Sequence, residues 1–493
     1  MKALKLTLLL LLLMPGLALG ATYTVCTSGC DYTTPQAVFD AVNLDPGDIV
    51  ELRADVVSGT SSYVGAAVQP GADDVGAEGN HIIIRGRTGD TITIDGSGAA
   101  YAWIQPASRN YYTWQNLRFI NGSTYTFRLQ GGIGFHFQNV TIDGGVRGLY
   151  MTTNAHTDVD ITGLVASNMT TDYGIRVQTD CIDCQWSNVT TNGNKASGVR
   201  IEYAGTLTGP WVIDNFTASL NQANGYQIQP SSGTRDYSAL TLSNGTLNSN
   251  YGHSFYVNNA DGGTVTDLVT YDSYNPSTTD YHHAFSFVTA SNWTVSRVRA
   301  YNGDDSFVLQ DGSNGNAFNN ILAYGPKKAT GRAFYSNSTN ANNTLVNSTI
   351  SSDLSGQPAA DIDGGDSGWT IKNTIFEHTG NGTAFFLEAG GSYPTMDYNC
   401  FYGSATPISD KGTDRSLSAW KTASSQDANS INADPLLHTD YTLKAGSPAI
   451  NAGTTLAAAY ATDFDGNDQR RFGRGWEIGA YVFKEVSSFG VGF

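Results

Sequence analysis

Four polar residues precede short strand-like sequences at similar places in a repeating pattern. His283 is followed by Ala-Phe-Ser-Phe, Asp305 by Ser-Phe-Val-Leu, and Arg332 by Ala-Phe-Tyr. His253 precedes Ser-Phe-Tyr-Val one repeat earlier. In a solenoid of parallel strands, successive coils stack about 4.8 Å apart. The spacing therefore predicts that the four side chains form one row, within reach of a few residues of a polymer.

Such a row suits removal of the C5 proton of a uronic acid. The reaction needs a cation beside the sugar carboxylate, a base for the C5 proton and an acid for the leaving oxygen. Histidine serves as a base near neutral pH. The candidates for these three roles are, in order, Arg332, Lys327 or Lys328; His283 or His253; and Tyr256 or Tyr281. The alternative is that the row is structural, because histidine and aspartate in turns often only cap the backbone.

Asp304 and Asp305 are adjacent and could share a metal ion. Ca²⁺ takes carboxylate and other oxygen ligands. A bound Ca²⁺ would bridge the two aspartates and the carboxylate of the substrate. Calcium is the one cofactor that the sequence suggests.

Residues 302–309 (Asn-Gly-Asp-Asp-Ser-Phe-Val-Leu) resemble the paired-Asp strand of the polygalacturonase-type glycoside hydrolases. The resemblance implies hydrolysis, with Asp304 and Asp305 dividing the roles of acid and base. The flanking sequences depart from that family. Its Asn-Thr-Asp is replaced by His-His-Ala at 282–284, its Gly-His-Gly by Gly-Arg-Ala at 331–333, and its Arg-Ile-Lys motif is absent. Hydrolysis is therefore a weaker hypothesis than proton abstraction.

The elements that must position these residues form a repeat. An Asn, or a substitute, recurs at intervals of about 20 to 30 residues within or just after a short apolar strand. The positions are 116, 139, 163, 188, 215, 244, 267, 297, 320, 347, 373 and 399, all Asn except Gly163, Asp267 and Arg297. Asn tolerates left-handed backbone, and its amide can bond to the Asn of the next coil. Short strands repeating in this way, with no helical period between them, predict a parallel β-helix.

Both ends of the repeat support this fold. Residues 34–42 predict a short helix, with Pro near its start and apolar residues at helical spacing. This helix resembles the N-terminal cap of many secreted right-handed parallel β-helix proteins. The sequences at 433–436 (Ala-Asp-Pro-Leu) and 446–453 (Gly-Ser-Pro-Ala-Ile-Asn-Ala-Gly) resemble the C-terminal coils of the pectate-lyase-like group. The resemblance implies an all-β chain that forms a single-stranded right-handed parallel β-helix of about a dozen coils with a short N-terminal capping helix.

One outward face of the predicted β-helix is rich in arginine and tyrosine. Side chains alternate along a strand, so residues between two core positions point outward. The residues assigned to substrate binding on this face are Arg128, Arg147, Arg176, Arg200, Tyr150 and Gln227. Arginine forks bind carboxylates, and amides bind sugar hydroxyls. The face is thus predicted to bind an acidic polysaccharide. An ordinary solvated sheet surface, which also tolerates these residues, is the alternative.

Composition limits the other partners and the cellular location. The formal charge of −17 argues against nucleic acid or an anionic membrane as a partner. Residues 1–20 read as a signal peptide, which predicts a secreted, periplasmic or cell-surface protein. No later segment is long and apolar enough for membrane insertion. We expect a monomer with an N-terminal cap and first coils at 21–79, the β-helix at 80–400, and C-terminal coils and cap at 401–493.

Five cysteines fit an exported chain. Cys26 and Cys30 flank a tight Thr-Ser-Gly and are expected to form a disulfide. Cys181 and Cys184 form an isolated C-x-x-C without a second pair of zinc ligands, which predicts a local disulfide or two packed thiols. Cys400 is expected to be a buried thiol.

The sequence therefore supports three functions in decreasing order. The first is an enzyme that acts on a uronate-containing polysaccharide by β-elimination or C5 epimerisation. The second is a cell-surface or extracellular carbohydrate-binding protein without catalysis. The third is a glycoside hydrolase.

Overall fold

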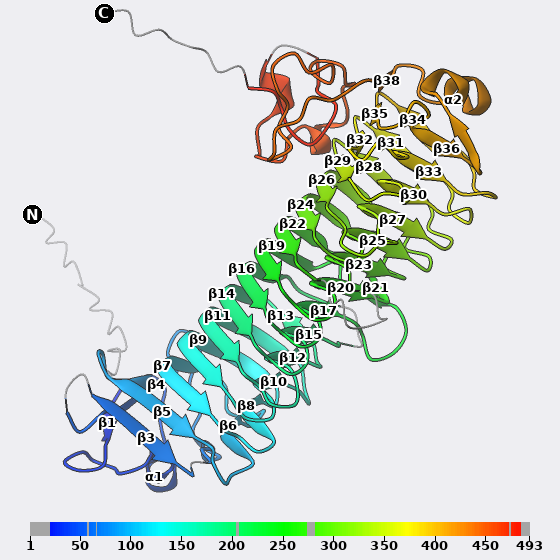
Figure 1. Cartoon of the computed structure of the whole chain (residues 1–493). Coiled ribbons are helices and arrows are strands. Elements are labelled where there is room, and N and C mark those ends of the chain that lie inside the picture. The colour runs from blue at the N-terminus through cyan, green and yellow to red at the C-terminus, as the bar shows by residue number, and fades with distance from the viewer. Residues whose placement is uncertain are drawn as a thin grey trace, which may run out of the picture.

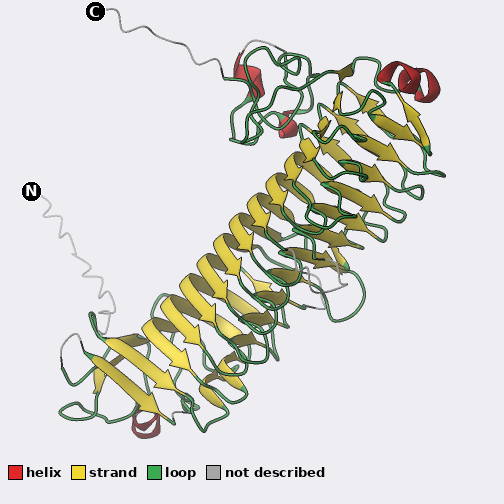
Figure 2. Ribbon diagram, viewed as in Figure 1, coloured by secondary structure: helices red, strands yellow, loops and turns green. Residues whose placement is uncertain are grey.

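The chain folds into an elongated right-handed parallel β-helix (Figures 1 and 2). The computed structural model describes residues 20–56, 59–65, 67–203, 207–273, 282–472 and 475–484. The solenoid has about 14 turns, which confirms the predicted fold. None of the helices in these ranges is long and apolar enough to cross a bilayer.

The longer strands form a 22-stranded sheet, here called sheet A. Its strands are β1 (Thr22–Val25), β2 (Ile49–Leu52), β3 (Thr60–Val64), β4 (Ile82–Gly86), β5 (Thr91–Asp95), β7 (Tyr112–Ile120), β9 (Gly132–Asp143), β11 (His156–Ser167), β13 (Cys181–Ile182), β14 (Cys184–Asn192), β16 (Trp211–Ser219), β19 (Leu240–Asn248), β22 (Thr264–Tyr271), β24 (Thr294–Tyr301), β26 (Ala317–Tyr324), β28 (Thr344–Val346), β29 (Thr349–Ser352), β31 (Thr370–Lys372), β32 (Ile375–His378), β34 (Thr395–Asp397), β35 (Cys400–Tyr402) and β38 (Ile431–Asn432).

The shorter strands form a 14-stranded sheet, here called sheet B. Its strands are β6 (Tyr101–Gln105), β8 (Tyr125–Leu129), β10 (Leu149–Met151), β12 (Ile175–Val177), β15 (Val199–Ile201), β17 (Tyr226–Ile228), β20 (Phe255–Asn258), β23 (Phe285–Val288), β25 (Phe307–Gln310), β27 (Phe334–Asn337), β30 (Ala360–Ile362), β33 (Phe385–Leu387), β36 (Ile408–Asp410) and β37 (Thr413–Arg415). A separate pair joins β18 (Arg235–Asp236) to β21 (Ala260–Asp261). Each named pair of strands is parallel except β36 with β37.

The two α-helices lie at opposite ends of the solenoid (Figure 1). The helix α1 (Pro35–Ala41) begins after Thr34, whose side chain accepts a hydrogen bond from the amide of Ala37. Its Phe39 ring lies 5.7 Å from the ring of Trp103 in the first coils, so the predicted N-terminal helix packs on the core. The other helices are α2 (Leu417–Ser424), η1 (Ala458–Tyr460) and η2 (Gln469–Phe472).

The core consists of side chains stacked from coil to coil. The rings of Phe255, Phe285, Phe307 and Phe334 stack at successive centroid distances of 5.0, 4.3 and 5.5 Å. All four side chains are fully buried. Each burial of a phenylalanine contributes roughly 1.5–3 kcal/mol, and the stack fixes the register of the strands that carry it. This register places the row of polar residues that precedes the strands.

The repeated Asn positions form a column of left-handed residues in sheet A. All predicted positions from 116 to 373 have φ between 47° and 75°. The last position is an exception, because the left-handed residue is Tyr398 and Asn399 is a buried hydrogen-bond donor to Ile371 and Asp427. Part of the column also bonds along the stack, as predicted: Asn139 Nδ2 lies 3.4 Å from Asn116 Oδ1, and Asn373 Nδ2 lies 3.1 Å from Asn347 Oδ1.

A segment after β38 lies along the later part of this column (Figure 1). Backbone carbonyls at 462, 460 and 454 accept hydrogen bonds from Asn320, Asn347 and Asn373, at 2.6, 2.8 and 2.8 Å. These three asparagines are buried, whereas Asn116, Asn139, Asn188, Asn215 and Asn244 are exposed. The sequence did not predict this packing, because nothing in the repeat marks which of its members are covered.

The cysteine predictions agree with the structure. Cys26 and Cys30 form a disulfide, and so do Cys181 and Cys184. Cys400 is a buried thiol whose pKa burial raises to about 12.

Replacing Asn215 by Leu is expected to destabilise the β-helix by roughly 1–3 kcal/mol. Asn215 has φ 48° and its amide bonds to Asn188, so the change introduces left-handed strain and removes one bond between coils. Urea denaturation of both proteins measures the difference. An unchanged midpoint would show that the column is not a source of stability.

Candidate functional site

The predicted row exists on successive coils of sheet B. His253, His283, Asp305 and Arg332 precede β20, β23, β25 and β27, which pair in that order. The imidazole rings of His253 and His283 stack 5.1 Å apart. His283 Nδ1 lies 3.2 Å from Asp305 Oδ2. The structure therefore brings the first three side chains together.

Backbone amides along the row donate hydrogen bonds to side chains of the preceding coil. The amide of His253 donates to Asn224 Oδ1 at 2.7 Å, and the amide of His283 donates to His253 Nδ1 at 3.1 Å. The amide of Arg332 donates to Asp305 Oδ1 at 2.7 Å. These bonds satisfy buried amides that the strands leave unpaired, so the row stabilises the turns whatever else it does.

His283 and Asp305 form a buried pair. Burial, and then the neighbouring His253 and His282, hold the pKa of His283 well below its usual value. Burial raises the pKa of Asp305 to about 6. The sequence predicted that Asp305 would favour the charged imidazole and His253 oppose it; burial outweighs the carboxylate, and His253 opposes the charge as expected. Both side chains are at most 5% exposed, so a polymer does not reach His283 in this conformation.

Tyr256 stacks on His253 at 4.8 Å and accepts a hydrogen bond from Asn258 at 2.8 Å. Its ring therefore lies beside the row as predicted. Tyr281, the other candidate acid, lies outside the described residues. So do residues 274–280 of the loop 272–280, which the length of this insertion predicts as one wall of the cleft. Lys327 is exposed, and its amide donates to Gly303.

The proposed calcium ligands do not converge. Asp304 Oδ2 accepts the amide of His282 at 2.9 Å and lies 3.7 Å from Lys328 Nζ. Asp305 is occupied by His283 and the amide of Arg332. Among the described residues, no third carboxylate, His or Cys joins the two aspartates as a metal group. These residues do not fit Ca²⁺, and we derive no step through it.

Arg332 lies in a cavity that sequence reasoning missed. A cavity of about 420 Å³ is lined by Arg332, Asp361, Glu388, Phe386 and Gln357, among others. Arg332 Nε donates to Asp361 Oδ2 at 2.8 Å, and its guanidinium lies 4.1 Å from the centre of the Tyr335 ring. Asp361 Oδ1 is buried and has no hydrogen-bond partner in the described part of the chain.

The environment of Asp361 shifts its ionisation toward neutral pH. Its side chain is 2% exposed. Burial raises the pKa of Asp361 to about 7, although Arg332 opposes the shift. Asp361 on β30 lies directly beside Tyr335 on β27. Extending the pattern of outward-facing residues by one coil would therefore have identified it. No sequence pattern marks the cavity beside it.

The arginine-rich face has the predicted order. Arg128, Tyr150, Arg176, Arg200 and Gln227 occupy one position on adjacent strands. Guanidinium groups and phenol rings alternate along it, at 5.0 to 6.0 Å from guanidinium carbon to ring centre, in contacts made by Arg128, Arg147, Arg176 and Arg200 with Tyr125, Tyr150 and Tyr173. Stacking of this kind holds the guanidinium planes in place.

Two carboxylates partly neutralise the arginines. Arg147 pairs with Asp172 at 2.5 Å, and both Arg176 and Arg200 pair with Glu202. Arg128 has no ion pair among the described residues. Four arginines thus face two acids, which leaves the face positive on a chain of charge −17.

Other members of the face are less accessible than predicted. Gln227 is 8% exposed, and it bonds to Ser197 and Gln229. Tyr150 is also 8% exposed. Further along the same column, Ser286 and Val308 are fully buried. The exposed surface therefore has two parts, one around the arginines and one at the Arg332 cavity.

Comparison with known proteins finds similarity in fold but not in sequence family. No protein-family profile matches the chain. No curated protein sequence matches it either. Among solved structures, pectate lyase Pel9A matches with 15% identity and a TM-score of 0.41, over 95% of this chain and 98% of that one.

Two other similar structures are those of enzymes with different names. The A-module of the Azotobacter vinelandii mannuronan C-5 epimerase AlgE6 has 11% identity and a TM-score of 0.39, covering 81% of this chain and 94% of that one. The PL6 family alginate lyase AlyGC has 10% identity and a TM-score of 0.46, covering 86% and 56%. These similarities concern the β-helix fold alone.

Proposed function

We propose that the protein is a secreted enzyme that binds a uronate-containing polysaccharide along sheet B and removes the C5 proton of a sugar at the Arg332 cavity. The observation that carries the proposal is the Arg332–Asp361 pair, a cation and a carboxyl of pKa about 7 on the wall of one cavity. Proton abstraction beside a carboxylate needs these two groups.

Asp361 and Arg332 have complementary roles in this mechanism. Asp361 Oδ1 takes the C5 proton after a local movement of the cavity wall, because this atom is buried in the present conformation. Arg332 faces the sugar carboxylate through nitrogens that its bonds to Asp361 and Thr330 leave available, and so stabilises the negative charge that develops. Tyr335 keeps its proton at neutral pH, because burial raises its pKa to about 12.

Two reactions can follow from the electron pair that the C5–H bond leaves behind. In β-elimination it forms a C4–C5 double bond while the C4–O bond breaks, and the leaving oxygen takes a proton, for which Tyr335 is the candidate acid. In epimerisation a proton returns to C5 from the opposite face. His283, the base predicted from the sequence, remains the second candidate, since it belongs to the same row as Arg332.

The arginine-rich face supports binding of an acidic polymer. Its excess of two positive charges and its stacked tyrosines suit a chain of carboxylates and sugar rings. Polymer that extends along the coils from this face would lead toward Arg332.

A second function, binding without catalysis, is favoured by the burial of the row. His283 and Asp305 are closed to solvent and bonded to neighbouring coils. Incubation with alginate and polygalacturonate separates the functions. A new absorbance from unsaturated uronate identifies a lyase, exchange of the C5 proton with deuterium identifies an epimerase, and binding with neither identifies an adhesin.

Removing the positive charge of the face is expected to weaken binding to alginate at least tenfold at low salt and to flatten its salt dependence. The variant replaces Arg128, Arg176, Arg200 and Glu202 by Gln. Glu202 is included because it is buried and would otherwise lose both arginine partners. Affinity is measured by calorimetry at two salt concentrations.

The control is Arg118→Gln with Arg470→Gln. It changes the net charge by the same −2 but at sites outside the face. Equal loss of binding in both proteins would mean that total charge, and not this face, attracts the polymer. Equal binding of a neutral glucan would also contradict the proposal.

A further inference from the structure

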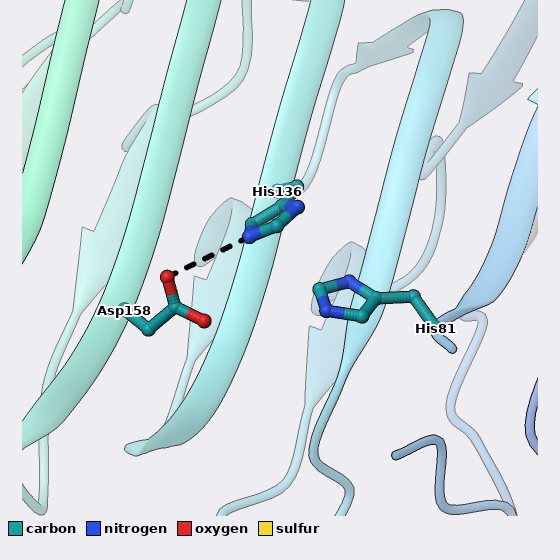
Figure 3. Close-up of side chains that lie close together, drawn as sticks. All are labelled: His81, His136 and Asp158. Atoms are coloured by element: carbon teal, nitrogen blue, oxygen red, sulfur yellow. Dashed lines mark ion pairs between the residues drawn. The ribbon is translucent and has the colours of Figure 1, made fainter. Parts of the chain in front are cut away.

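Two histidines and an aspartate meet on sheet A near the N-terminal end. His81 precedes β4, His136 lies in β9 and Asp158 lies in β11. Figure 3 shows His136 between the other two side chains. The imidazole rings lie 4.2 Å apart, and His136 Nε2 lies 3.7 Å from Asp158 Oδ1. One ligand atom from each residue lies within 4.8 Å of the others.

Among these contacts, no cation balances the carboxylates that approach His136 in the described residues. His136 Nε2 is buried without a hydrogen-bond partner in the described ranges, although two carboxylates approach it. The second carboxylate is Asp160, at 3.6 Å. A divalent cation among these groups would supply that balancing charge.

The neighbouring residues prepare His81 as a ligand. His81 Nδ1 lies 3.0 Å from Thr113 Oγ1. When Nδ1 carries the proton and donates to this hydroxyl, Nε2 keeps the lone pair that a metal needs. Thr113 lies on β7, between β4 and β9 in the sheet.

We propose that His81, His136 and Asp158 bind one divalent transition-metal cation of the zinc class, with Asp160 within reach as a fourth ligand. Imidazole nitrogen with one or two carboxylate oxygens suits Zn²⁺ rather than Ca²⁺ or Mg²⁺, which prefer oxygen ligands. Tetrahedral zinc places its ligand atoms about 3.3 to 3.5 Å apart, slightly closer than the contacts here. His136 and Asp158 are 25% and 42% exposed, so both side chains have room to close on the ion.

The site would add a link between coils that strand pairing and core packing already hold together. Its ligands come from the coils of β4, β9 and β11, and Thr113 joins them from β7. It lies on sheet A, whereas the Arg332 cavity is at later coils of sheet B, so this proposal is independent of the proposed function.

Calorimetric titration of the EDTA-dialysed full chain with ZnCl₂ tests the site. We expect one equivalent to bind at pH 7.5 with a Kd of about 1 µM or lower. His81→Gln and His136→Gln should each weaken binding at least about 100-fold, and Asp158→Asn about tenfold. His438→Gln, which alters an exposed histidine elsewhere, should bind as the parent does.

Co²⁺ provides a second measurement that needs no variant. Its absorption in the visible range should show the intense bands of tetrahedral coordination, and Zn²⁺ should abolish them. The proposal is overturned if Zn²⁺ does not bind at one equivalent, if binding survives both His→Gln changes, if Co²⁺ gives only weak octahedral bands, or if Ca²⁺ or Mg²⁺ at equal concentration displaces Zn²⁺.

Discussion

Asp361→Asn is expected to lower turnover of the acidic polysaccharide by roughly 10²- to 10⁴-fold while the affinity changes little. A positioned general base contributes about this factor, and an amide cannot take the C5 proton. Asn keeps the volume of the side chain and an oxygen that can accept from Arg332 Nε. Turnover is measured as unsaturated uronate released or as C5 deuterium exchanged, and affinity by calorimetry.

The pH dependence gives the same prediction a second readout. Because the pKa of Asp361 is raised to about 7, kcat/KM should rise with pH through about 7 as the base becomes ionised. The free energy of unfolding, by contrast, should fall as the pH rises. The folded pKa lies above the unfolded value of 3.8, so the folded state is favoured by the neutral acid and becomes less stable as the pH rises from about 4 to about 7. For this shift the cost is roughly 4 kcal/mol.

Comparison with Asp361→Asn isolates this cost, since the variant carries no charge at that position. Its free energy of unfolding, relative to the parent protein, should increase between pH 4 and pH 8. A constant difference would mean that the carboxyl titrates near its ordinary pKa and is not a base for neutral pH.

Asp410→Asn is the matched control. Asp410 is also 2% exposed, pairs with Arg415 at 2.7 Å and leaves Oδ1 without a partner in the described residues, but it does not line the cavity. It should retain turnover. If His283→Ala abolishes turnover and Asp361→Asn does not, His283 is the base and the row must open to admit substrate.

Asn347→Ala is expected to destabilise the protein by about 4 kcal/mol, more than any change at the exposed end of the same column. Asn347 is fully buried, with φ 47°. Its amide donates to Asn319 at 3.0 Å and to the carbonyl of Tyr460 at 2.8 Å, and its oxygen accepts from Asn373. Each buried polar group left without a partner costs about 1–3 kcal/mol, and left-handed backbone costs alanine about 1–2 kcal/mol more.

The control for this prediction is Asn215→Ala. Asn215 has the same backbone conformation but is exposed, so water can replace its lost bond. Urea denaturation of the two variants should show the larger loss at position 347. Equal losses would mean that backbone strain alone matters and that the covering segment adds nothing.

The fold could be predicted from the sequence because the fold is repetitive. Each coil repeats a left-handed residue and two inward apolar positions, so an Asn such as Asn139 can be recognised because Asn occupies nine of the twelve repeat positions. Strand alternation then fixes which residues share a column, and the order Arg128, Tyr150, Arg176 followed from it. The row from His253 to Arg332 was predictable for the same reason.

The sequence could not show which of these side chains are buried. Periodicity assigns a side chain to a face but does not tell whether other residues cover that face. His283 and Gln227 were assigned to substrate-facing positions and are buried. Asp361 was overlooked because its neighbours, and not its position in the repeat, give it an unusual pKa. His81 and His136 lie 55 residues apart, and only the stacking of coils brings them together.

The segment after β38 changes how the solenoid should unfold. A stack whose coils contact only their neighbours can open one coil at a time from either end. Here the carbonyls at 462, 460 and 454 bond to asparagines on three consecutive coils, in an order that runs against the direction of stacking. Opening any of those coils breaks a hydrogen bond to the same segment. The coils from β26 to β32 should therefore behave as one cooperative unit with slow hydrogen exchange, while those near β1 fray independently.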